Sequence, residues 1–410
     1  MTTCDIISLQ TQKWGIAMKI NSITVKGFKA LNNASFEPGN VNVFIGANGS
    51  GKSTILEAIG VLSAAMTDRV DNTSLDRKGI RLSTPSLYKS SFLRVDRKAP
   101  TIGFEIQWTD GADTVKYDLN LNNPKDDSAW RYHSEAIYRN GNKLWGRSGN
   151  SQIQYDDRIG VLMLAQEEQL GRIKASAEQL KDYAIYQPST PILRGIMPDK
   201  YQTTPVGLCG GRLAEAIEDL IRDDDGDIKF GDLYVDEVLE IIDWASNFSV
   251  AAPKKSSINS SVPTSRRVIE FQDKYMRDSD RFTAYDASEG SLYVLFLLCL
   301  AMHDKAPDVF AVDNFDQAMN PRLAKATTRI FCDLVKKHGK TAFITTHNPL
   351  VLDGLKLDDP TIRLFTVERS KKDGSAQIRR IEVTQELIDF DQPLSRLWIN
   401  GRLGGVPNLL

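Results

Sequence analysis

The sequence predicts an α/β fold with a β-rich first lobe, a largely helical middle insertion and a second lobe built on a parallel sheet. Short apolar runs at residues 41–45, 309–313 and 341–345 have the length and composition of buried strands. Alternating strands fill residues 90–145, and residues 160–250 show mainly helical patterns. A chain of 410 residues, 41% of them hydrophobic, is long enough for about two to three domain-sized units.

The elements follow in a clear order. Residues 1–17 form an N-terminal extension, and residues 18–66 are predicted to form three strands, a Gly-rich loop and a helix. The first lobe, residues 18–150, continues with hairpins that turn at Asp110-Gly111 and Asn140-Gly141. The middle insertion, residues 151–281, includes a loop rich in Ser, Pro and Lys at 253–267. Residues 282–410 form the second lobe, which ends in a hairpin around residues 372–374 and a terminal helix.

The Gly-rich loop reads Gly46-Ala-Asn-Gly-Ser-Gly-Lys-Ser53 and fits the pattern G-x-x-x-x-G-K-[ST] of phosphate-binding loops. A predicted strand precedes it and a predicted helix follows, so its backbone N–H groups and the helix N-terminus favour phosphate. Lys52 is expected to reach the β- and γ-phosphates and Ser53 to bind Mg²⁺. The expected phosphate contacts are Gly46, Asn48, Gly49, Gly51, Lys52, Ser53 and Thr54. The alternative is a Gly-rich turn that fits the pattern by chance.

Three later segments complete a nucleotide site. Asp313 ends an apolar run and is expected to hold Mg²⁺ beside the loop. Ser288 and Gly290 stand before an apolar helix, where a hydroxyl and an N–H group can receive a γ-phosphate. Ser288 can also be a plain N-cap. His347 follows the next apolar strand, where it can contact the γ-phosphate and the attacking water or have a structural role.

These motifs, in this order, resemble the ATP-binding cassette superfamily over residues 20–66 and 282–355. They look most like its non-transporter branch of SMC, RecF and OLD-type ATPases. Residues 185–194 and 394–405 look like parts of stand-alone RecF-like ATPases, which occur in the Septu, PARIS and retron anti-phage systems. The resemblance implies an ABC-type ATPase head that uses ATP and Mg²⁺. It also implies a head-to-tail homodimer, or a higher assembly, in which Ser288 and Gly290 contact ATP held by Lys52 of a second copy.

Two departures from the family pattern concern catalysis. In the family, the aspartate that ends this apolar strand is called the Walker B aspartate, and a glutamate that acts as general base usually follows it. Here Asp313 is followed by Asn314. An amide cannot accept the proton, and loss of a general base slows a reaction by about 10²–10⁴-fold. We therefore expect weak hydrolysis, unless Asp316 or His347 replaces the base. The Q-loop glutamine of the family has no clear match, although Gln107 lies at about the right position.

Composition narrows the function classes. The net charge of −2 gives no global basic field for nucleic acid, and four scattered cysteines fit thiols in a reducing cytoplasm. No run has transmembrane length, so a membrane partner and a transporter role are disfavoured. Asp223-Asp-Asp-Gly-Asp227 reads as a solvated turn rather than a cation loop.

The sequence therefore predicts an ATP-gated scaffold that controls a separately encoded effector, a nuclease, in anti-phage defence. The alternative is a RecF- or SMC-like repair ATPase that clamps DNA. Its candidate phosphate contacts are Lys254, Lys255, Arg266 and Arg267, although an ordinary solvated loop also explains them.

Overall fold

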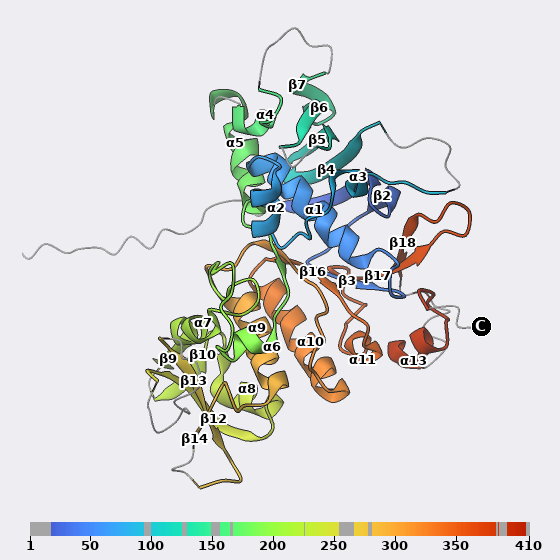
Figure 1. The fold of residues 1–410 in the computed structure, drawn as a ribbon. Coiled ribbons are helices and arrows are strands. Elements are labelled where there is room, and N and C mark those ends of the chain that lie inside the picture. The colour runs from blue at the N-terminus through green and yellow to red at the C-terminus, as the bar shows by residue number, and fades with distance from the viewer. Residues whose placement is uncertain are drawn as a thin grey trace, which may run out of the picture.

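The computed structural model describes residues 18–93, 100–124, 129–148, 156–164, 167–224, 226–253, 266–277, 281–382, 384 and 392–406. The expected N-terminal extension, residues 1–17, and most of the loop at 253–267 lie outside the described residues. Two six-stranded sheets organise the fold, and two three-stranded sheets belong to the middle insertion (Figure 1).

The first large sheet is antiparallel and forms the β-rich lobe. Its strands, in spatial order, are β2 (Leu31–Phe36), β1 (Lys19–Phe28), β4 (Ile102–Asp110), β5 (Asp113–Asn122), β6 (Arg131–Arg139) and β7 (Asn142–Arg147). The two hairpin turns predicted at Asp110-Gly111 and Asn140-Gly141 join β4 to β5 and β6 to β7. The β-rich first lobe is therefore confirmed.

The second large sheet joins strands from both ends of the chain. Its spatial order is β18 (Ala376–Ile381), β17 (Ile362–Arg369), β3 (Val41–Ile45), β16 (Thr341–Thr345), β15 (Val309–Val312) and β8 (Ile185–Tyr186). All neighbours pair in parallel except β17 and β18, which form the predicted carboxy-terminal hairpin. Parallel strands end at the same edge of a sheet, so residues that are far apart in sequence meet there.

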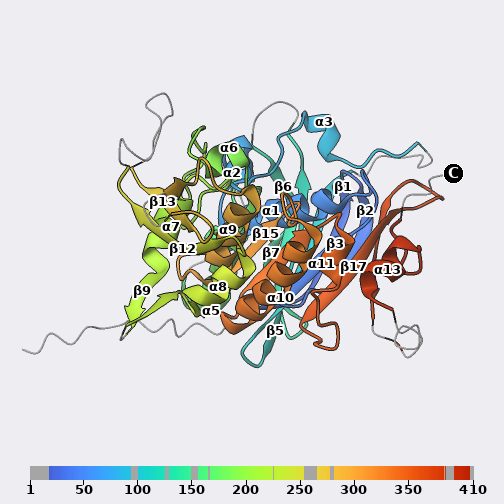
Figure 2. The same cartoon turned by 90° about the horizontal axis from the view of Figure 1, so that it is seen from below.

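Helices cover both faces of this parallel sheet. Phe44, Phe343 and Phe365 point to the face that packs with α1 (Lys52–Thr67) and the first sheet. Val43 and Ile344 point to the opposite face, where α9 (Glu289–Met302) and α10 (Pro321–Lys337) pack (Figure 2). This alternation follows from the two-residue period of a strand.

Helix α9 is apolar on all sides, and residues 290–302 are all buried. A helix that is hydrophobic all round belongs in a core or a membrane. Among the described residues, no helix combines the length and the hydropathy needed to cross a bilayer. The most apolar run of the chain is therefore the centre of the second lobe's core.

The middle insertion is less helical than predicted. It contains two small antiparallel sheets that the helical patterns concealed, β9–β10–β11 and β12–β13–β14. Their strands are β9 (Ile221–Asp224), β10 (Asp227–Phe230), β11 (Leu233–Tyr234), β12 (Ala245–Ala251), β13 (Val268–Asp273) and β14 (Arg281–Thr283). A short apolar stretch is compatible with either a strand or a turn of helix. In these segments, pairing with partner strands determined that strands form.

The remaining helices are short. They are α2 (Asn72–Arg77), α3 (Pro85–Tyr88), α4 (Val161–Leu164), α5 (Glu167–Ala177), the 3₁₀ helix η1 (Glu178–Leu180), α6 (Thr190–Leu193), α7 (Leu213–Leu220), α8 (Val235–Ile241), α11 (Pro349–Leu352) and α13 (Leu394–Ile399). The last of these is the predicted terminal helix.

Candidate nucleotide-binding site

The phosphate loop connects β3 to α1, as the sequence predicts. Every residue of β3 is buried, and α1 begins at Lys52. Gly46 has φ +155°, and a Cβ there would collide with the carbonyl oxygen of Val367 on the neighbouring strand β17. Gly51 has φ +115°, and a Cβ would lie 2.9 Å from the Cβ of Ala376. Both positions need glycine because both have left-handed φ values and the carboxy-terminal hairpin approaches the loop closely, with its backbone at Gly46 and with the Ala376 side chain at Gly51.

The loop borders a cavity of about 340 Å³. Predicted site residues from three separate parts of the chain line this cavity. Its lining comprises Asn48, Gly49, Ser50, Gly51, Lys52, Ser53, Thr54, Arg81, Asp313, Asn314, His347 and Arg369. Gly46 lies at the base of the loop, where its carbonyl oxygen contacts Lys52.

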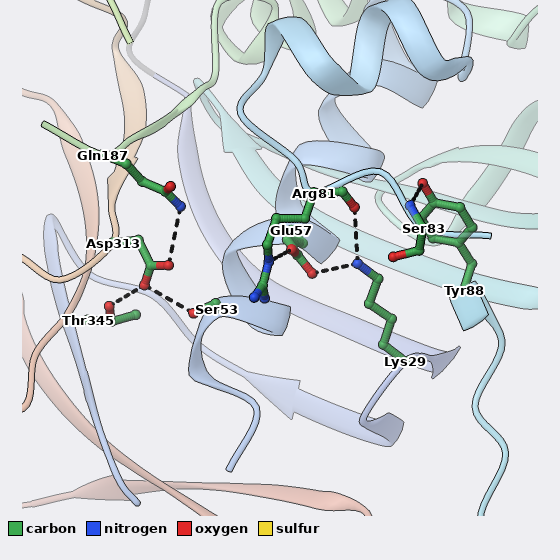
Figure 3. A network of polar contacts seen from close by, with 9 residues as sticks. All are labelled: Lys29, Ser53, Glu57, Arg81, Ser83, Tyr88, Gln187, Asp313 and Thr345. Atoms are coloured by element: carbon green, nitrogen blue, oxygen red, sulfur yellow. Dashed lines mark hydrogen bonds and ion pairs between the residues drawn. The ribbon is translucent and has the colours of Figure 1, made fainter. Parts of the chain in front are cut away.

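The Asp313 carboxylate is the centre of the polar contacts in this cavity (Figure 3). Its Oδ1 accepts hydrogen bonds from Ser53 Oγ at 3.1 Å and from Thr345 Oγ1 at 2.5 Å. Its Oδ2 accepts one from Gln187 Nε2 at 3.4 Å. Gln187, Asp313 and Thr345 lie at the carboxyl ends of β8, β15 and β16, which are neighbours in the sheet. Oxygen atoms of a hydroxyl, a carboxylate and an amide are suitable ligands for Mg²⁺.

Lys52 is buried and bonds to its own loop. Its ammonium donates to the carbonyl oxygens of Gly46 at 2.7 Å and Ala47 at 3.1 Å. Burial lowers the pKa of Lys52 to about 8, although the nearby Asp313 carboxylate opposes this shift. The buried hydroxyl of Ser50 makes no hydrogen bond to any residue that the structure describes. The loop therefore offers a cation and an unused hydroxyl to an anionic ligand.

The three candidate catalytic residues differ in position. Asn314 lines the cavity and has a left-handed backbone, with φ +57°. His347 also lines the cavity, and desolvation and the nearby Lys52 charge lower its pKa. Asp316 is not among the cavity residues, and it accepts a hydrogen bond from Thr346 Oγ1 at 2.6 Å. Of the two alternatives to a glutamate base, only His347 borders the phosphate loop's cavity.

The predicted γ-phosphate receptor lies elsewhere on the same molecule. Ser288 and Gly290 do not line the cavity that contains Lys52. Ser288 is exposed at the N-cap position of α9, but its side chain makes no capping hydrogen bond. Gly290 is buried, and a Cβ there would lie 3.1 Å from the carbonyl oxygen of Ala318. The plain N-cap interpretation of Ser288 therefore lacks its hydrogen bond.

Sequence reasoning missed Gln187. It follows the two-residue strand β8, and its side chain donates a hydrogen bond to Asp313, the residue predicted to hold Mg²⁺. The alternative, Gln107, lies on β4 of the first sheet and donates to Glu105 at 3.0 Å. A strand of two residues is too short to give a periodicity signal. The signal that could have identified Gln187 is its position at the end of an apolar run, which is also the position of Asp313.

The segment that carries Gln187 continues to the start of α9. The Tyr293 hydroxyl donates to the carbonyl oxygen of Pro188 at 2.8 Å, and Arg194 Nη2 donates to that of Ala287 at 3.1 Å. Thr190 also bonds to Glu289. The residues after Gln187 thus connect the Asp313 carboxylate to the start of α9, whose N-cap residue is Ser288.

Two arginines of the cavity were also missed. Arg81 pairs with Glu57 at 2.8 Å, and the same buried Glu57 carboxylate pairs with Lys29 at 2.8 Å (Figure 3). Arg369 donates to the carbonyl oxygen of Gly49 at 3.0 Å. Arg81 and Arg369 also border a neighbouring cavity of about 650 Å³, which provides room next to the phosphate loop.

The remaining candidates take no part in this site. Lys254 and Lys255 lie outside the described residues, Arg266 is exposed, and Arg267 pairs with Glu218 at 3.0 Å. In the acidic run, Asp223 and Asp224 end β9 and Asp227 begins β10, and residue 225 is not described. Within the described ranges, no group of three or more His, Cys, Asp or Glu side chains could hold a metal.

Comparisons with known proteins agree with this geometry. A family model described as "AAA ATPase domain" matches residues 18–118. A second, described as "AAA domain, putative AbiEii toxin, Type IV TA system", matches residues 244–353. No curated protein sequence matches the chain.

Solved structures show the fold. The chain is similar to an SMC head bound to the C-winged helix domain of ScpA, with a TM-score of 0.54, 12% identity, and coverage of 90% of this chain and 99% of that chain. It is also similar to an SMC head with an extended coiled coil bound to the C-terminal domain of ScpA derived from Pyrococcus furiosus. That pair has a TM-score of 0.50, 12% identity, and coverage of 91% and 99%. The chain therefore carries two matches to AAA-type ATPase domain models and shares its fold with SMC heads.

Proposed function

We propose that the protein binds Mg²⁺ and ATP at the phosphate loop and that ATP closes two copies head to tail. The observation that carries the proposal is the convergence of Lys52, Ser53 and Asp313 on one cavity. Lys52 supplies a positive charge to the β- and γ-phosphates, and Ser53 and Asp313 supply oxygen atoms to Mg²⁺.

The residues present fit both groups. Among the described residues, the Ser50 hydroxyl in the loop has no hydrogen-bond partner and the Lys52 ammonium bonds only to loop carbonyls, which a phosphate can replace. Asp313 is only 8% exposed, and its carboxylate is held by neutral donors rather than by a cation. A divalent cation at this position would supply a positive counter-charge bound directly to the buried carboxylate. Bound Mg²⁺ would neutralise charge on the phosphates during transfer.

Calorimetry with ATP and Mg²⁺ tests the binding proposal. The wild-type protein should bind ATP, and Lys52→Ala should lose that binding. Lys19→Ala, which removes an exposed lysine from β1, serves as the matched control. Equal affinities in all three proteins would refute the assignment of the loop.

The dimer proposal is supported by the position of Ser288. Its exposed hydroxyl lies outside its own phosphate cavity, so it is free to meet ATP held by a second copy. Light scattering should show ATP-dependent dimers for the wild type and monomers for Ser288→Arg. Asn33→Arg, an exposed change on β2, should still dimerise. Dimers of Ser288→Arg with ATP would exclude the signature role of this residue.

We further propose that the closed dimer is long-lived and gates a separately encoded effector, a nuclease, in cytoplasmic anti-phage defence. Asn314 in place of a glutamate base supports slow hydrolysis. The family description that names a putative toxin of a type IV TA system supports a role in a system with more than one component. Mass spectrometry of proteins that co-purify from the native host tests this role. Lys52-dependent degradation of nucleic acid by the purified protein alone would contradict it.

A DNA clamp is the second candidate, because the fold is that of an SMC head. A gel-shift titration separates the two functions. Tight, salt-sensitive binding of duplex DNA by the isolated protein, only with ATP, would favour the clamp.

A further inference from the structure

The carboxy-terminal segment after α13 has no role in the site described so far. We propose that residues 403–405, here called the strap, hold the phosphate loop in its binding conformation, with Gly405 as the positioning residue. This inference rests on the proposed ATP binding at that loop.

The strap touches the phosphate loop where β3 ends. Gly405 has φ +72°, and a Cβ there would lie 3.3 Å from the Cα of Gly46. It would also lie 3.6 Å from the carbonyl oxygen of Ile45 and from the Cβ of Thr366. Gly46 is therefore enclosed between Val367 of strand β17 on one side and Gly405 on another.

The strap is anchored, so this contact is not a loose approach. The N–H group of Gly405 donates to the Glu368 carboxylate, and Arg379 Nη2 donates to the carbonyl oxygen of Leu403 at 2.7 Å. Leu403 is 2% exposed and packs in the core of the second lobe. Ser395 of α13 bonds to Asp353 through both its N–H group, at 2.9 Å, and its hydroxyl, at 2.7 Å. Figure 2 shows α13 beside β17.

The anchors of the strap belong to the hairpin that also holds the far side of the loop. Glu368 and Arg379 lie on β17 and β18. Arg369, next to Glu368, donates to the carbonyl oxygen of Gly49, and Ala376 packs on Gly51. The strap and hairpin thus contact the loop at its start, its tip and its end.

This arrangement has a direct consequence for affinity. A phosphate loop binds through backbone N–H groups, which must point inward before the ligand arrives. A loop that is already ordered loses less conformational entropy on binding. Loosening or displacing the strap should therefore weaken binding of ATP, although no strap residue lines the phosphate cavity.

Two glycine substitutions separate positioning from general stability. Gly405→Ala adds a methyl group against Gly46, whereas Gly401→Ala adds one in the turn before the strap, 3.6 Å from the side chain of Val406. Both residues have left-handed backbones, with φ +72° and +73°, so both variants carry the same backbone cost, and only Gly405→Ala adds a contact with the phosphate loop. Calorimetry should show about tenfold weaker ATP binding for Gly405→Ala, which is about 1.4 kcal/mol. Gly401→Ala should bind ATP as the wild type does.

Glu368→Gln provides a second variant that keeps the number of heavy atoms and removes the charge from the Gly405 hydrogen bond. It should also weaken ATP binding, by about three- to tenfold, and it decides the matter if Gly405→Ala does not fold. If wild type and Gly401→Ala bind ATP and both other variants bind it equally well, the positioning role is wrong and the proposed function stands. If the wild type does not bind ATP, the proposed function fails and the strap's role fails with it.

Discussion

Restoring a carboxylate at position 314 should raise the rate of ATP hydrolysis. Asn314 lines the phosphate cavity directly after Asp313, and its backbone N–H group donates to Thr345 Oγ1 at 2.9 Å. That hydrogen bond depends on the backbone, so Asn314→Glu preserves it. The glutamate adds a group that can accept a proton from the attacking water.

Two opposing effects set the size of this gain. A general base accelerates a step by about 10²–10⁴-fold, which is about 2.7–5.4 kcal/mol at 1.36 kcal/mol for each factor of ten. The left-handed backbone at position 314 suits asparagine, whereas a glutamate there costs about 1 kcal/mol, and a backbone that shifts to relieve this cost moves the carboxylate out of line with the water. We therefore expect a gain near the lower end, about 100-fold in kcat.

The assay measures phosphate release at saturating ATP and Mg²⁺. Asn314→Gln is the matched control, because it has the same length and backbone cost as the glutamate variant but no base. Adding Lys52→Ala to Asn314→Glu should return the rate to background, which shows that the activity belongs to this loop. Equal rates for the Glu and Gln variants would refute the reasoning and leave His347, which borders the same cavity, as the base to test.

Three further results are expected. Gln187→Ala removes a hydrogen-bond donor to the Asp313 carboxylate, so the apparent affinity for Mg²⁺ in ATP binding should fall several-fold. Gln107→Ala should leave that affinity unchanged, and equal Mg²⁺ titrations of the two variants would contradict the prediction. Lys52 has a pKa of about 8, so it is charged below that pH, and binding above it must take up a proton. Affinity for ATP should therefore fall by up to about tenfold for each pH unit above 8, and a flat profile would count against Lys52. Arg147→Met should lower the free energy of unfolding in urea by about 3 kcal/mol, because it leaves the buried Glu135 carboxylate unpaired; a loss below about 1 kcal/mol would contradict a buried pair.

Local signals were sufficient for half of the site. The phosphate loop and Asp313 each follow an apolar strand, and pattern and spacing reveal them without knowledge of the fold. Gln187 follows a strand of only two residues, so the same rule had no statistical strength there. Arg81 and Arg369 belong to no motif, because their positions depend on how the chain returns to the loop.

The middle insertion shows the same limit. Its helical patterns are real at α7, but β9, β10 and β12 become strands only by pairing with neighbours. Strand formation depends on cross-strand partners more than on intrinsic preference.

The sequence by itself determined a Gly-rich loop that fits the phosphate-loop pattern, an aspartate at the end of an apolar strand and an asparagine directly after it. These features are local, since a strand, a turn and a helix N-terminus provide the phosphate contacts within about a dozen residues. Only the tertiary structure decided which glutamine reaches Asp313, that Ser288 lies outside its own cavity, and that Gly405 packs on Gly46. The physical reason is the parallel sheet, whose strand order brings residues more than 300 positions apart to one edge.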